Sequence, residues 1–139
     1  DLLKELCRDA LVPVLVLPEQ LVFTVGESCG MMYIVVNGMA QYTAQLPAGR
    51  GGGHPTLVRR VLQGGQWLSE AALWTGWVHR GELRTLSECL FFGLDAAKFA
   101  KVISSHKSVH SCAAGYARKF VEGLNSSVQS DITEAGPVD

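Results

Sequence analysis

The residues best suited to chemistry lie between Gln66 and Arg80. Glu70 is followed by Ala71-Ala72-Leu73 and, after a short interval, by His79 and Arg80. Small side chains at the start of a helix let its free N–H groups approach an anion, which the helix dipole also favours. A guanidinium pairs with a phosphate through two hydrogen bonds, and a neutral imidazole cannot. Ala71–Leu73 and Arg80 are thus residue types suited to an anion, and Glu70 places a carboxylate beside them.

The rest of the chain must supply a framework for this turn, and it consists largely of short apolar runs. Predicted strands cover residues 14–17, 21–25, 31–36, 39–46 and 56–62. Two further apolar runs lie within residues 83–94. Short strands at close spacing favour a barrel or a sandwich. We therefore expect a mainly β fold, an antiparallel β-barrel or jelly roll between about residues 13 and 94 with flanking helices.

Turn residues separate the predicted strands. Asn37-Gly38 lies between two apolar runs and favours a hairpin, because a type I′ turn needs positive φ at both central residues. Gly26-Glu27 and Gly64-Gly65 mark further turns. Residues 47–55 are rich in glycine but lack the GxxxxGK[ST] order of a P-loop, so we expect a surface loop at a hairpin tip.

Helical periodicity is found near the two ends of the sequence. Residues 1–12 form an amphipathic pattern, residues 95–103 are predicted as a helix capped by Asp95, and residues 109–124 carry one apolar side. We expect residues 1–125 to form one domain and the polar residues 126–139 to be a frayed tail or linker. The abrupt start within a helical pattern suggests a piece of a longer protein.

Composition and charge limit the partners of the chain. The 139 residues suffice for one domain with a single core. Lys and Arg number 12 against 13 Asp and Glu, which gives no general attraction to nucleic acid or an anionic membrane. The longest apolar run, Ala10 to Leu17, is far shorter than the roughly 20 residues that cross a bilayer. We expect no nucleic-acid partner and no direct membrane contact from this segment.

The cysteines and histidines do not gather into a site in the sequence. The four cysteines make no CxxC pair and follow no secretory leader, so we expect mostly buried thiols in an intracellular, cytoplasmic compartment, including the cytoplasmic side of a membrane protein. His106 and His110 have i, i+4 spacing but lack a third metal ligand. No nucleophile or acid/base pair is indicated. The sequence thus predicts no enzyme, no metal and no cofactor.

Four blocks of the sequence resemble, in the same order, the signatures of cyclic nucleotide-binding domains. The blocks are Leu17–Glu27, Met32–Gly38, Leu62–Glu70 and Leu83–Leu94. They are similar to the family's Pro-Gly-Glu strand, its Met-Tyr strand ending in glycine, its Gly-Glu phosphate-binding cassette and its last strands. The resemblance covers about residues 1–125 and implies a double-stranded β-helix with an N-terminal helix and C-terminal lid helices. An unrelated cupin-type jelly roll would instead need clustered histidines.

The resemblance implies a ligand, cAMP or cGMP, and assigns residues to it. Glu70 would accept a hydrogen bond from the ribose 2′-OH, or alternatively satisfy amides at the helix N-terminus. The first helical turn, Ala71–Leu73, would bind the cyclic phosphate. Ser69 stands where the family has glycine. An ungapped count from Glu70 places His79 at the family's arginine position, while a loop one residue longer places Arg80 there.

Aromatic and basic residues could complete such a pocket. The helix that closes over the base in this family carries three possible base contacts here, which are Tyr116, Arg118 and Lys119. Three tryptophans near the cassette could stack on a base, or fill core and close the pocket. These are Trp67, Trp74 and Trp77.

Two functions follow from the resemblance. The first is a regulatory module that binds cAMP or cGMP and relays occupancy through its C-terminal helix to a larger protein such as an ion channel or kinase. The second is a domain of the same fold that has lost nucleotide binding and acts as a protein-interaction or gating module. Ser69, His79 and Glu82 favour the second, because each weakens the expected binding of a phosphate.

Overall fold

The computed structural model describes residues 1–47, 52–126 and 129–133. The elements in chain order are α1 (Leu2–Asp9), β1 (Leu11–Val16), β2 (Leu21–Phe23), β3 (Ser28–Cys29), β4 (Met31–Asn37), β5 (Ala40–Leu46), β6 (Thr56–Leu62), β7 (Trp67–Leu68), α2 (Ala71–Trp74), β8 (Trp77–Val78), β9 (Glu82–Thr85), β10 (Cys89–Asp95), α3 (Ala96–Ser104) and α4 (Lys107–Asn125). The strands span residues 11–95, close to the predicted β region of about residues 13–94.

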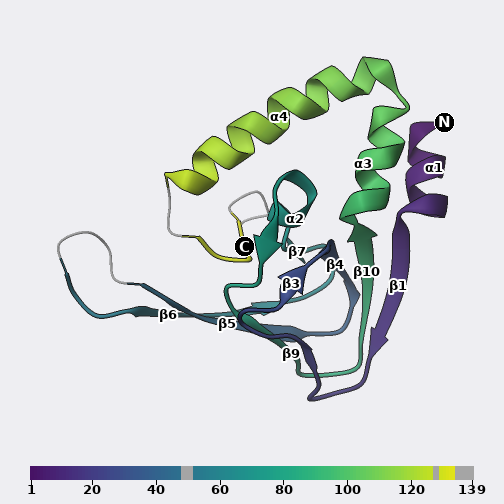
Figure 1. Cartoon of the computed structure of the whole chain (residues 1–139). Coiled ribbons are helices and arrows are strands. Elements are labelled where there is room, and N and C mark those ends of the chain that lie inside the picture. The colour runs from purple at the N-terminus through teal and green to yellow at the C-terminus, as the bar shows by residue number, and fades with distance from the viewer. Residues whose placement is uncertain (48–51, 127–128, 134–139) are drawn as a thin grey trace.

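Two four-stranded antiparallel sheets enclose the core (Figure 1). One has the order β1-β10-β4-β7 and the other β2-β9-β5-β6, while β3 and β8 form a separate short ladder. Phe91 and Val35 from the first sheet join Tyr42 and Leu83 from the second in one buried cluster. Burial of apolar side chains between two antiparallel sheets is typical of a jelly roll. The predicted mainly β fold with flanking helices is confirmed.

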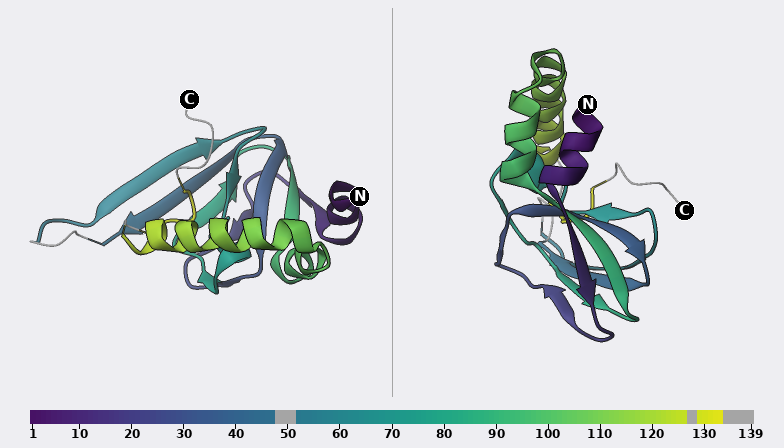
Figure 2. Two further views of the ribbon diagram at one scale, coloured as in Figure 1. Left: turned by 90° about the horizontal axis from the view of Figure 1, so that it is seen from above. Right: turned by 90° about the vertical axis from the view of Figure 1, so that its right-hand side faces the viewer.

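The helices stand together at one end of the sheets, although they come from opposite ends of the sequence (Figures 1 and 2). α1 lies beside α3, and the His106 imidazole that follows α3 is 3.1 Å from the Glu5 carboxylate of α1. α4 then runs back across the side of the molecule that carries α2 (Figure 2). The last helix therefore covers the segment that contains Glu70.

Local chemistry sets the helix boundaries. Asp95 caps α3 as predicted, since its carboxylate accepts a hydrogen bond of 2.9 Å from the N–H of Lys98. The prediction for residues 109–124 is confirmed by α4. The first helix was expected to reach Val12 but ends at Asp9, and Leu11 already pairs with β10. Pro13 explains the difference, because a proline disfavours helical geometry in the residue before it.

The predicted hairpin at Asn37-Gly38 is wrong. β4 pairs with β10 and β7, whereas β5 pairs with β6 and β9, so the dipeptide carries the chain from one sheet to the other. Gly38 has a φ of +93°, but Asn37 does not share the positive φ that a type I′ turn requires. A Cβ at Gly38 would lie 2.8 Å from the Cys89 Sγ. The glycine is needed for this close crossing.

The loop between β5 and β6 joins a true hairpin, in which Leu46 pairs with Thr56. Residues 48–51 of the predicted glycine-rich loop lie outside the described residues. The expectation of mostly buried thiols is wrong, because Cys7 and Cys112 lie on exposed helix faces and Cys29 is only half-buried. No helix within residues 1–47, 52–126 and 129–133 is long and apolar enough to cross a membrane.

Candidate functional site

The predicted anion-binding turn forms a single helical turn, α2, that is closely tied to its neighbours. Ala71 and Ala72 are buried, and the N–H groups of Ala72 and Leu73 bond to the carbonyls of Ser69 and Glu70. Ser69 has a φ of +64°, in the left-handed region that favours glycine. Its hydroxyl is buried with no hydrogen-bond partner. The backbone thus adopts a bend suited to glycine while carrying serine.

A carboxylate from the end of the chain lies in the space beside this turn. Asp131 is 1% exposed. Its Oδ1 accepts a hydrogen bond of 2.8 Å from the Trp77 indole and lies 3.1 Å from the His79 Nδ1. Its Oδ2 accepts bonds of 2.8 Å from the backbone N–H groups of Arg80 and Gly81. This oxygen also accepts a bond of 2.6 Å from the Tyr42 hydroxyl.

The backbone of Asp131 also forms hydrogen bonds with the rest of the domain. The Asp131 carbonyl accepts a 2.7 Å hydrogen bond from the Ser69 N–H, and its own N–H donates to the Tyr42 oxygen at 3.1 Å. The sequence predicted a frayed tail here, but the structure packs Gln129 to Thr133 against the sheets. Burial of a carboxylate is tolerated because each oxygen is hydrogen-bonded. Whether the remaining polar residues act as a linker stays a prediction.

Asp131 and His79 form a buried ion pair. Burial opposes the imidazolium, but the hydrogen bond to Asp131 and the contact with Cys29 outweigh it and raise the pKa of His79 to about 9. Burial likewise opposes the carboxylate, yet hydrogen bonds from His79, Tyr42 and Trp77 hold the pKa of Asp131 below its usual value. The His79 ring also stacks on Phe23, with ring centroids 3.6 Å apart. The site therefore stabilises a negative charge with a cation and oriented N–H groups.

Arg80 and Gly81 contribute through their backbones. The Arg80 guanidinium is directed outward, 5.0 Å from the centre of the Trp77 ring and 3.0 Å from the Gln129 Oε1. A Cβ at Gly81 would lie 2.5 Å from the Tyr42 hydroxyl and 2.7 Å from the Thr43 carbonyl oxygen. Only glycine lets this amide come close enough to share the carboxylate.

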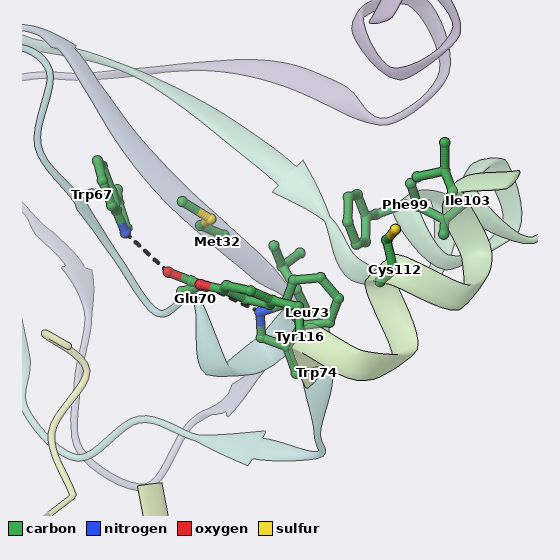
Figure 3. A pocket seen from close by; sticks show the side chains of 11 residues that line it. Met32, Trp67, Glu70, Leu73, Trp74, Phe99, Ile103, Cys112 and Tyr116 are labelled. Atoms are coloured by element: carbon green, nitrogen blue, oxygen red, sulfur yellow. Dashed lines mark hydrogen bonds between the residues drawn. The ribbon is translucent and has the colours of Figure 1, made fainter. Parts of the chain in front are cut away.

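Glu70, the other predicted ligand-binding carboxylate, is bound by three aromatic side chains (Figure 3). Its Oε1 accepts a hydrogen bond of 3.2 Å from the Trp67 indole. Its Oε2 accepts bonds of 3.1 Å from Trp74 and 2.7 Å from the Tyr116 hydroxyl. Burial and the bond to Glu70 raise the pKa of Tyr116 to about 12. Glu70 thus connects β7 and α2 to the last helix.

The last helix contacts α2 and α3 through aromatic rings. Trp74 lies against Phe99 and Tyr116, with ring centroids 5.5 and 5.1 Å apart. Tyr116 in turn stacks on Phe120, at 6.2 Å. All three predicted base contacts are exposed, but the Tyr116 hydroxyl, on a side chain that is 45% exposed, reaches Glu70. The described residues contain no cluster of three or more potential metal ligands.

The structure therefore brings the predicted residues into two groups. Ser69, His79 and the Arg80 amide surround Asp131, while Glu70 and Tyr116 form the second group. Sequence reasoning missed Tyr42, Gly81 and Asp131. Asp131 lies in a polar segment with no local pattern, and Tyr42 alternates into the core like any strand residue. Gly81 could have been noticed as a glycine directly after the basic pair.

Comparison with known proteins supports a fold assignment. No protein-family model matches the sequence, and no curated protein matches it. The N-terminal domain of a transcriptional regulator from Streptomyces coelicolor A3(2) has a TM-score of 0.64 at 16% identity, over 86% of this chain and 82% of that one. A cyclic nucleotide-binding-like protein from Brucella abortus gives 0.60 at 19%, over 74% and 83%.

The catabolite activator protein of Thermus thermophilus matches with a TM-score of 0.58 at 18% identity, over 84% of this chain and 53% of that one. The fold is that of the cyclic nucleotide-binding domains. At such identities the likeness describes the architecture of the chain. Within this fold, three of the residues assigned to the phosphate-binding cassette, Ser69, His79 and Arg80, contact Asp131.

Proposed function

We propose that the chain is a non-enzymatic regulatory module of the cyclic nucleotide-binding fold whose anion site is occupied by its own Asp131. The observation that carries the proposal is the set of five contacts to the Asp131 carboxylate. They come from one indole nitrogen, one imidazole nitrogen, two backbone amides and one hydroxyl. A carboxylate and a cyclic phosphate both carry one negative charge and accept hydrogen bonds. The same donors cannot serve both at once.

Tethering favours the internal carboxylate over a free ligand. Asp131 follows the last residue of α4, Asn125, by only a short segment. A group on a short tether competes with an effective concentration of roughly millimolar. The Arg80 guanidinium points outward, towards Gln129 and the Trp77 ring. It therefore does not offer a phosphate in the site the bidentate pairing that an arginine can make. A cyclic nucleotide would have to displace a bound carboxylate without this compensation.

A series of hydrogen bonds connects the anion site to the last helix. The Asp131 carbonyl binds the Ser69 N–H, and Ser69 adjoins Glu70. Glu70 binds the Tyr116 hydroxyl of α4. We propose that release or retention of Asp131 alters the position of α4, and that α4 passes this change to a larger parent protein such as an ion channel or kinase.

A second candidate is a sensor of cAMP or cGMP in which the ligand displaces Asp131. The fold favours it, as does the chemistry of the site, since amides, an imidazolium and a hydroxyl suit a phosphate as well as a carboxylate. In this case Glu70 would bind the ribose 2′-OH, and Ala71–Leu73 would approach the phosphate. Glu70 would first have to give up part of its bonding to Trp67, Trp74 or Tyr116.

Thermal unfolding with cAMP and cGMP separates the two candidates. A ligand with a Kd of about 10 μM would stabilise the folded state by about 2.7 kcal/mol at 1 mM. We expect no rise in Tm for the unaltered chain and a measurable rise for Asp131→Asn, which frees the donors from a charged competitor. Thr133→Ala, in the same segment, is the matched control and should behave like the unaltered chain.

A clear rise in the Tm of the unaltered chain would reject occupancy by Asp131 as the dominant state and favour the sensor. Calorimetric titration of the same variants gives the affinity directly. No binding by Asp131→Asn, in a protein that still unfolds cooperatively, would mean that the tail alone does not exclude the nucleotide.

A further inference from the structure

A second, chemically different site lies on the other side of Glu70, under the last helix. It is an open pocket of about 590 Å³ between β4, α2, α3 and α4. Its walls are apolar and aromatic, and they include Met32, Leu73, Trp74, Phe99 and Tyr116 (Figure 3). Pockets that bind small molecules usually measure roughly 300–1,000 Å³ and have mainly apolar walls with few polar groups. The size and lining therefore suit an organic ligand.

The charge of this pocket is unbalanced. Among the residues that the structure describes, Glu70 is the one carboxylate in its lining, and no Lys, Arg or His lines it. All three hydrogen bonds to the Glu70 carboxylate come from the neutral groups of Trp67, Trp74 and Tyr116. Among the described residues no cationic side chain forms a salt bridge with Glu70, which is only 6% exposed. A buried carboxylate of this kind is stabilised by an added positive charge.

The aromatic walls of the pocket also favour a positively charged ligand. Trp67, Trp74 and Tyr116 surround the carboxylate, and the Phe99 ring is nearly perpendicular to the Trp74 ring (Figure 3). The faces of aromatic rings attract cations, and cages of such rings recognise quaternary ammonium groups. An anion such as a cyclic nucleotide would meet Glu70 with no cation to offset the repulsion. Carboxylate and rings together select one sign of charge.

We propose that this pocket binds an organic cation, an ammonium group carrying an apolar or aromatic body. The ammonium lies near Glu70 and the indole rings, and the body fills the space towards Phe99 and Ile103. Because α2, α3 and α4 all contribute walls, such a ligand holds the last helix against the sheets. The inference uses none of the contacts of Asp131 and does not depend on the function proposed above.

The probe for this site is benzyltrimethylammonium chloride, compared with neutral benzyl alcohol and anionic benzenesulfonate. Binding is followed by tryptophan fluorescence, which Trp67 and Trp74 report, and by calorimetry. We expect the cation to bind at least about tenfold more tightly than either comparison compound, a difference of about 1.4 kcal/mol. Equal affinity for all three probes overturns the proposal. So does the absence of cation binding at concentrations up to about 10 mM, the range of weak ligands.

Two variants assign the binding to this pocket. Glu70→Gln removes the charge and should abolish the preference for the cation over benzyl alcohol. Ala113→Phe fills the cavity from α4 while leaving Glu70 unchanged, and should block the cation even if Glu70→Gln fails to fold. Lys119→Ala, on the exposed face of α4, is the control and should bind as the unaltered chain does. Retained cation binding in a folded Ala113→Phe protein contradicts the proposal.

Discussion

At the scale of single residues, Ser69 shows a local conflict between sequence and structure. Its backbone occupies the left-handed region at φ +64°, and its buried hydroxyl has no partner. The left-handed conformation costs a residue other than glycine about 1–2 kcal/mol, and an unsatisfied buried hydroxyl adds to this cost. The turn is nevertheless kept, because the Ser69 N–H bonds to the Asp131 carbonyl and its own carbonyl accepts from Ala72.

Ser69→Gly is therefore expected to stabilise the protein. Removing both the Cβ and the unpaired hydroxyl should raise the free energy of unfolding by about 1–2 kcal/mol. Urea unfolding measures the change. Ser69→Ala is the matched control, since it removes the hydroxyl but keeps the Cβ, and it should recover only part of the gain. A glycine variant no more stable than the alanine variant would show that the backbone is not strained.

At the scale of elements, the crossing from β4 to β5 depends on the close approach of Gly38 to β10. A Cβ at this position would meet the Glu88 carbonyl and the Cys89 Sγ. Gly65 has nearly the same φ, +92° against +93°, but a Cβ there meets no atom within 4 Å. The two glycines thus share a backbone conformation and differ in their surroundings.

This pair allows backbone strain to be separated from packing. Gly65→Ala should lower the free energy of unfolding by about 1–2 kcal/mol, the cost of a positive φ. Gly38→Ala should lower it by at least about 2 kcal/mol more, because backbone atoms of another strand obstruct the methyl group. Denaturant unfolding of both variants measures the difference. Equal losses would mean that the crossing can widen without cost.

At the scale of the whole molecule, the ion pair of His79 and Asp131 links the end of the chain to global stability. The pKa of His79 is raised to about 9 from an ordinary value near 6.5. A raised folded-state pKa contributes stability that is fully present below about pH 6.5 and is lost as the pH rises through about 9. The lowered pKa of Asp131 contributes stability that is lost only in acid, as the pH falls below its ordinary value.

We expect the free energy of unfolding to decrease between about pH 6.5 and 9, by about 3 kcal/mol if the whole shift is expressed. Urea unfolding across this range, with far-UV circular dichroism as the signal, is the measurement. In Asp131→Asn the decrease should disappear, because burial then favours neutral His79. The groups that face His79 include Asp131, Cys29 and the rings of Phe23 and Tyr33. A decrease of equal size in Asp131→Asn would assign it to other groups.

The sequence alone determined those features that depend on residues close together in the chain. Short apolar runs separated by turn residues predicted the strands, and Asp95 predicted the start of α3. The resemblance of residues 62–70 to the phosphate-binding cassette implied the helical turn after Glu70. The ordered signature blocks predicted the cyclic nucleotide-binding fold. Such patterns are readable because hydrogen bonding and capping act over a few residues.

Tertiary structure alone decided what occupies the anion site and which partners Glu70 has. Asp131 meets Tyr42 across 89 residues and His79 across 52, and Tyr116 meets Glu70 across 46. Asn37-Gly38 was expected to form a hairpin, but long-range pairing places β4 and β5 in different sheets, so the dipeptide connects the two sheets. A carboxylate in a polar segment carries no local sign of burial. Only the folded arrangement of the sheets brings it to two free amides, an imidazolium and a hydroxyl whose combined hydrogen bonds offset its desolvation.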